Sequence, residues 1–73
     1  MSAYRILTSG PILTQTGTIV QVRKYVERYA PLKRGWTGEW EKHPNGKSWR
    51  YRRFNSKGNK MPTSYDIYVV RIT

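Results

Sequence analysis

Residues 36–54 constrain the fold more than any other part of the chain, because they contain its strongest turn signal. Asn45 and Gly46 lie there between two runs of strand-forming residues. Both loop residues of a type I′ hairpin turn need a positive φ, which Asn and Gly tolerate best. The sequence therefore predicts a β-hairpin in which Asn45 and Gly46 form a two-residue loop.

This turn determines which residues of the two predicted strands lie opposite each other. The predicted pairs are Pro44 with Lys47, His43 with Ser48, Lys42 with Trp49, Glu41 with Arg50, Trp40 with Tyr51 and Glu39 with Arg52. Two of these pairs join opposite charges, and such cross-strand pairs contribute roughly 0.2–1 kcal/mol each. A shift by one residue would lose both pairs, so the charge pattern supports the same register as the turn.

The register also sorts the side chains by face, because they alternate along a strand. One predicted face holds the aromatic residues with two basic ones: Trp36, Trp40, Trp49, Tyr51, Lys42 and Arg53. The opposite face holds most of the charged residues: Thr37, Glu39, Glu41, Arg50, Arg52 and Phe54.

The aromatic face has two interpretations. It is either a core face that packs against a helix or an exposed platform that stacks unpaired bases. Because the chain has few leucines and isoleucines from which to build a core, we expect at least Trp40 and Tyr51 to be buried. Trp36 and Trp49 lie nearer the strand ends, where partial exposure is expected.

The segment that begins at Thr18 has the periodicity of an amphipathic helix. Its apolar residues form one stripe at helical spacing: Ile19, Val22, Tyr25, Val26 and Tyr29. Thr18 and Gln21 have the spacing of a capping box, and Pro31 ends the helix. A strand over residues 18–26 is the alternative, since Val, Ile, Thr and Tyr favour strands, but it would place basic residues among the valines.

Two further strands are predicted over residues 3–8 and 64–73, whereas residues 12–17 are Thr-rich and expected to be irregular. The last strand is apolar on both faces, which indicates a central strand or an oligomer contact. Residues 55–63 form a polar loop. The resulting order, β-α-β-β-β, predicts a single small α+β domain over residues 1–73, with one helix packed on an antiparallel or mixed sheet.

Several classes of site are not expected from the composition. The chain has no cysteine and one histidine, His43, so neither a metal site nor another cofactor is predicted. No apolar run reaches the ~18–20 residues that span a bilayer, and the N-terminus lacks the layout of a signal peptide. We therefore expect a cytoplasmic protein without a membrane partner.

An enzymatic function is not expected either. The chain has four carboxylates, and the two that lie close together, Glu39 and Glu41, each have an arginine opposite in the predicted register. This arrangement is typical of ion pairs and not of an acid–base pair. The sequence also lacks a nucleophile elbow and a phosphate-binding glycine loop.

The net charge of +10 on 73 residues is the strongest global property of the chain. A compact domain with this charge attracts polyanions over about a Debye length, ~8–10 Å at physiological salt. Nucleic acid is the commonest polyanion, so the sequence predicts a non-enzymatic module that binds DNA or RNA.

Most of the basic residues lie between positions 33 and 60. The predicted interface consists of Lys33, Arg34, Lys42, Lys47, Arg50, Arg52, Arg53, Lys57 and Lys60. In this interpretation the loop residues contact phosphates and the strand arginines reach base edges, since arginine is the commonest reader of guanine. A solvated basic face without a binding role is the alternative.

Two other functions compete with nucleic-acid binding. One is a small inhibitor or adaptor that docks on an acidic protein surface, such as the groove of a nucleic-acid-binding enzyme. The other is an obligate oligomer, for example a homodimer, in which the apolar last strand pairs between chains.

The stretch EWEKHPNGKSWRYRR, residues 39–53, resembles the sheet of the arm-type DNA-binding domains of phage and transposon integrases. In those domains a small antiparallel sheet with basic and aromatic residues lies on DNA. The likeness covers about fifteen residues and consists mainly of the hairpin signal, and here the helix precedes the hairpin instead of following it. The resemblance implies a DNA-binding sheet, and the size and charge of the chain are those expected of a small accessory protein of a phage or mobile element.

Overall fold

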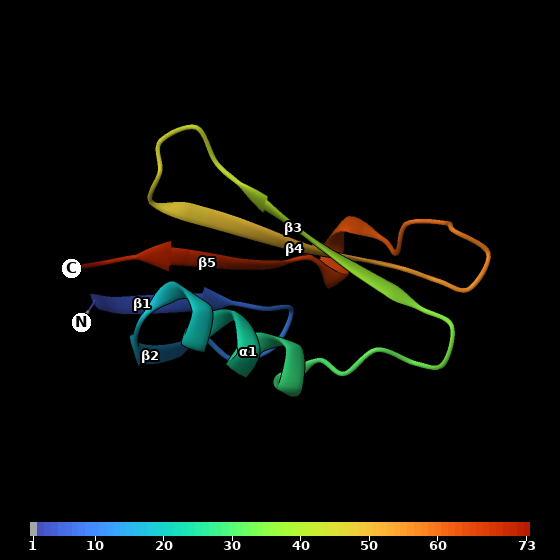
Figure 1. The fold of residues 1–73 in the computed structure, drawn as a ribbon, viewed down its shortest axis with the longest axis horizontal. Helices are drawn as coiled ribbons and strands as arrows, with labels where there is room; N and C mark the ends of the chain where they lie inside the picture. Colours follow the sequence, from blue (N-terminus) through green and yellow to red (C-terminus); the bar gives the residue numbers. More distant parts are fainter. Residues whose placement is uncertain (1) are drawn as a thin grey trace.

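The computed structural model describes residues 2–73 and shows one helix packed on a five-stranded sheet (Figure 1). The elements are β1 (Ser2–Leu7), β2 (Leu13–Gly17), α1 (Ile19–Tyr29), β3 (Thr37–Lys42), β4 (Ser48–Phe54), the 3₁₀ turn η1 (Thr63–Tyr65) and β5 (Ile67–Arg71). The strands lie in the order β2-β1-β5-β4-β3. The predicted α+β fold is confirmed, and every strand pairing is antiparallel, so the mixed-sheet alternative does not apply.

Strand β2 is the main difference from the sequence prediction, in which residues 12–17 were irregular. It pairs with β1, placing Gln15 opposite Tyr4 and Leu13 opposite Ile6, while Thr14 stays exposed. An edge strand buries only one face and has one paired neighbour, so a polar, threonine-rich segment is compatible with it. The element order is therefore β-β-α-β-β-β.

The helix prediction is confirmed, including its start. The Thr18 side chain accepts a hydrogen bond from the backbone N–H of Gln21, and the Gln21 side chain accepts one from the N–H of Thr18. Val22 and Val26 are buried, whereas Tyr29, expected in the apolar stripe, is 44% exposed because it lies in the last turn. No helix in residues 2–73 is long and apolar enough to cross a membrane.

The hairpin of β3 and β4 has the predicted register but a different turn. Trp40 lies opposite Tyr51, and the two predicted Glu–Arg pairs face each other. The turn type is wrong, because in residues 2–73 only glycines have a positive φ, with Gly46 at 74°. The Gly46 N–H donates to the His43 carbonyl at 2.9 Å and the His43 N–H to the Ser48 carbonyl at 2.8 Å. The first of these hydrogen bonds closes a four-residue turn from His43 to Gly46, as in a type I turn with proline second and glycine fourth.

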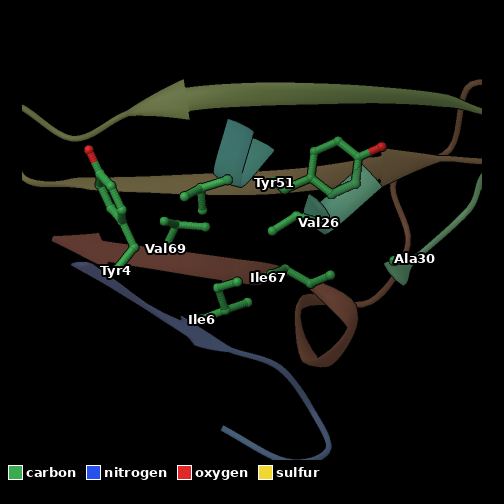
Figure 2. Packing of buried hydrophobic residues seen from close by; sticks show 8 residues of the cluster. Tyr4, Ile6, Val26, Ala30, Tyr51, Ile67 and Val69 are labelled. Atoms are coloured by element: carbon green, nitrogen blue, oxygen red, sulfur yellow. The ribbon is translucent and has the colours of Figure 1, made fainter. Parts of the chain in front are cut away.

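The core lies between α1 and the helix-facing side of the sheet (Figure 2). It consists of Tyr4, Ile6, Val22, Val26, Ala30, Tyr51, Ile67 and Val69. Tyr51 is 2% exposed, which confirms that this part of the aromatic face is core. Trp40, which was expected to be buried, packs against the cluster but is only partly buried, and so is Trp49.

Strand β5 lies between β1 and β4, as predicted for a strand with two apolar faces. Ile67 and Val69 point to the helix side and are buried, whereas Tyr68 and Val70 alternate with them on the other side. Because both edges of β5 are already paired, a contact between two chains through this strand would use its face and not its edge.

Candidate nucleic-acid interface

The side of the sheet that faces away from α1 has no helix over it within residues 2–73, and we call it the open face. Its members follow from the strand registers: Ala3, Arg5, Leu7, Thr14, Thr16, Thr37, Glu39, Glu41, Ser48, Arg50, Arg52, Phe54, Tyr68 and Val70. Tyr68 is opposite Leu7 on one side and opposite Arg50 on the other. Arg50 in turn lies opposite Glu41, so an aromatic ring lies beside a charged pair in the middle of the sheet.

The two strand arginines of the open face pair with the glutamates of β3, as the sequence predicted. Arg50 Nη2 lies 3.3 Å from Glu41 Oε1, and Arg52 Nη2 lies 3.7 Å from Glu39 Oε2 and 3.5 Å from Glu41 Oε2. Both arginine side chains are partly exposed, and both glutamates are more than half exposed. Exposed ion pairs contribute at most about 1 kcal/mol, so exchange of partners costs little.

Asp66 is a third acidic partner, which no local sequence pattern reveals. Its side chain is 1% exposed and lies 3.9 Å from Arg50 Nε. Lys60 Nζ lies 3.0 Å from Asp66 Oδ1 and also donates to the Met61 carbonyl at 3.1 Å. Lys60, predicted as a phosphate contact, is therefore held by a buried carboxylate and anchors the loop that precedes η1.

Arg50 has both Glu41 and Asp66 as acidic neighbours. The Tyr68 hydroxyl raises the pKa of the Arg50 guanidinium, with smaller contributions from Glu41 and Asp66, while burial opposes the shift. Arginine is already charged at any pH at which a protein folds. Arg50 is therefore a permanent cation, and its cross-strand neighbour in β5 is the aromatic Tyr68.

Two other predicted interface residues lie on the helix-facing side of the sheet. Lys42 Nζ lies 5.9 Å from the centre of the Trp49 ring, a cation–π distance. Arg53 donates from Nη2 to the Tyr65 carbonyl at 2.8 Å. The hairpin alternation had already assigned both residues to the aromatic face, so the nine predicted residues do not form one patch.

The remaining four predicted residues lie in exposed connections. Lys33 and Arg34 precede β3, Lys47 lies in the hairpin turn and Lys57 lies in the loop after β4. Lys33 Nζ is 5.3 Å from the Trp36 ring centre. None of the four lies within 4.0 Å of a carboxylate oxygen in residues 2–73.

Several basic residues outside the predicted set also contribute to the surface. Arg5 is an exposed member of the open face, and its position in β1 next to β5 is visible only in the folded sheet. On the helix side, Lys24 and Arg28 are exposed, and Arg23 lies 5.1 Å from the Trp40 ring centre. The excess positive charge therefore surrounds the molecule, while the open face itself is close to charge-balanced.

A cavity of about 430 Å³ lies at the hairpin end of the sheet. The residues that line it are Glu41, Lys42, His43, Pro44, Ser48, Trp49, Arg50 and Tyr68. Four of these belong to the open face, and His43 is joined to Ser48 by a backbone hydrogen bond of 2.8 Å. Within residues 2–73, no three His, Cys, Asp or Glu side chains are grouped as metal ligands would be. The cavity thus offers two aromatic rings, those of Trp49 and Tyr68, together with hydrogen-bond donors and acceptors.

Comparison with protein-family models, with curated proteins and with solved structures found no match for this chain.

Proposed function

We propose that this protein is a non-enzymatic nucleic-acid-binding module. The open face would contact bases, and the basic residues of the surrounding loops would contact phosphates. The ligand class is DNA or RNA, with base contacts assigned to the strand arginines and phosphate contacts to the loop lysines.

The observation that carries the proposal is the unbalanced positive charge. Of the basic residues in residues 2–73, only Arg50, Arg52 and Lys60 lie within 4.0 Å of a carboxylate. The other basic side chains have no carboxylate within this distance, and their charges repel one another in a compact domain and attract polyanions. Phosphates release counterions when such cations neutralise them, which favours binding.

The division of roles follows from the ion pairs. Arg50 and Arg52 already have carboxylate neighbours, so the net attraction of the open face for a phosphate is weak. The same pairs present donors and acceptors next to each other, which is what base edges require. Lys47 and Lys57 have no such neighbours, so they are the better phosphate contacts.

The test is fluorescence anisotropy with labelled single- and double-stranded DNA and RNA at about 0.15 M salt. The variant Lys47→Glu/Lys57→Glu is compared with Lys24→Glu/Arg28→Glu, which makes the same change in net charge on the exposed side of α1. We expect the loop variant to bind at least about tenfold more weakly than the helix variant, a difference of about 1.4 kcal/mol.

Two results would contradict the proposal. Failure of the wild-type protein to bind any of the four probes would exclude the function. Equal losses for the two double variants would show that the loops carry no specific phosphate contacts.

A second candidate function is a protein-binding adaptor, which the apolar part of the open face favours. Tyr68 is 37% exposed there, and Leu7 and Val70 are only partly buried. An adaptor would form a stoichiometric complex with an acidic protein and would not be retained on nucleic acid. Sedimentation of the protein alone separates both functions from a dimer formed through this face.

A further inference from the structure

The hairpin cavity combines the aromatic rings of Tyr68 and Trp49 with several polar side chains. The Tyr68 ring lies in the row of Leu7 and Arg50, and the cavity of about 430 Å³ lies next to it. Its size is near the lower end of the range for small-ligand sites, ~300–1,000 Å³. A concave site of this size suits one planar group and does not admit a duplex.

We infer that this cavity binds one unpaired base of a single-stranded nucleic acid, with Tyr68 as the stacking surface and Glu41 as the acceptor for an exocyclic amino group. The inference rests on the proposed function and specifies its ligand. Aromatic side chains on an uncovered sheet commonly stack bases that are splayed out of a single strand.

Glu41 has the capacity to accept further hydrogen bonds. Its side chain is 54% exposed, and its contacts with Arg50 at 3.3 Å and Arg52 at 3.5 Å use one oxygen each. An ionised carboxylate has about four acceptor positions. Guanine, adenine and cytosine carry an exocyclic amino group, whereas thymine and uracil do not. The cavity therefore selects amino-bearing bases over thymine and uracil.

The donors of the cavity are also held in place. His43 Nδ1 accepts a hydrogen bond from the Asn45 backbone N–H at 3.1 Å, so the proton of the neutral ring is on Nε2. Arg50 Nη2 is paired with Glu41 Oε1 at 3.3 Å, and Arg50 Nε lies 3.9 Å from Asp66 Oδ2. Because these groups are positioned before a ligand binds, little side-chain conformational entropy is lost on binding.

The test compares Tyr68→Ala with wild type on oligo(dC), oligo(dT) and a duplex of mixed sequence. Loss of one stacked base corresponds to a roughly 5- to 150-fold loss of affinity for the single strands. We expect that loss for oligo(dC), no change for the duplex and near wild-type binding for Tyr68→Phe, which keeps the ring. Tyr29→Ala, which removes a similarly exposed tyrosine of α1, is the matched control and is expected to bind like wild type.

The Glu41 contact is tested with the same homopolymers. Wild type is expected to bind oligo(dC) more tightly than oligo(dT), and Glu41→Gln is expected to reduce that preference. Equal binding of the two homopolymers by wild type would overturn the role of Glu41.

The outcomes separate this inference from the proposed function. The base site is wrong, while the proposed function stands, if Tyr68→Ala binds single strands as tightly as wild type does. The same holds if its affinity falls by the same factor for single strands and for the duplex. If wild type binds none of the probes at about 0.15 M salt, both are wrong.

Discussion

Tyr51 and Gly38 form a contact that leaves no room for an additional methyl group. The Tyr51 ring crosses from β4 towards β3, and a Cβ built on Gly38 would lie 2.6 Å from two of its ring carbons. Tyr51 itself is 2% exposed, so its ring cannot move into solvent without opening the core. Glycine at position 38 is therefore needed for packing and not for a special backbone angle.

Gly38→Ala is expected to lower the free energy of unfolding by about 1–3 kcal/mol, the usual cost of overpacking a core. Urea denaturation followed by tryptophan fluorescence measures the change. Gly10→Ala is the control, because a Cβ there meets its nearest neighbour at an ordinary 3.7 Å. A Gly38→Ala protein as stable as wild type would show that Tyr51 does not pack over this residue.

Burial of Tyr51 also has a consequence at alkaline pH. Burial raises the pKa of the Tyr51 phenol, Glu27 adds to the shift and Arg53 partly offsets it. The folded state then holds this proton more tightly than the unfolded state, whose phenol titrates near about pH 10. The corresponding stability is present below that pH and is lost as the pH rises through and above it.

Denaturation curves measured at several alkaline pH values test this linkage. Wild type is expected to lose stability more steeply above about pH 10 than Tyr51→Phe, which has no phenol proton at this position. Parallel stability curves for the two proteins would contradict the raised pKa.

The helix α1 depends on its cap because only two of its residues are fully covered by the sheet. Val22 and Val26 are buried, and the capping box of Thr18 and Gln21 satisfies backbone groups at the helix start. A helix of eleven residues is too short to be stable on its own. The cap and the sheet contact therefore act together.

Thr18→Ala is expected to cost about 1 kcal/mol, the typical value for losing such a cap. Thermal unfolding followed by circular dichroism measures the loss, and Thr18→Ser, which keeps the hydroxyl, is expected to restore most of it. The capping role would be contradicted if the alanine and serine variants melted at the same temperature as wild type.

The elements that the sequence predicted correctly are those with strong local patterns. The helical stripe and the Thr18–Gln21 spacing predicted α1, and the charge pairs predicted the hairpin register. The prediction of a type I′ turn was wrong because Pro44 is compatible with the second position of a type I turn. In that turn Gly46 has a positive φ and Asn45 does not. Strand β2 was missed because its pairing with β1, and not its own composition, makes it a strand.

At the scale of the whole molecule, the candidate site depends on contacts between distant parts of the chain. The fold places Arg5 of β1, Tyr68 of β5 and Arg50 of β4 on one open face. The alternation within the hairpin predicted the positions of Arg50 and Arg52, but the buried Asp66 that holds Lys60 had no local signal. Charge composition predicted a class of ligand, whereas the cavity became visible only when β4 and β5 were paired.

The salt dependence of binding tests the central claim most directly. If Lys33, Arg34, Lys47 and Lys57 each neutralise one phosphate, the plot of log K against log salt concentration for a single-stranded probe has a slope of about −3. The Lys47→Glu/Lys57→Glu variant is expected to lose about half of that slope. A slope near zero for wild type would contradict the account, because binding would then not involve phosphates.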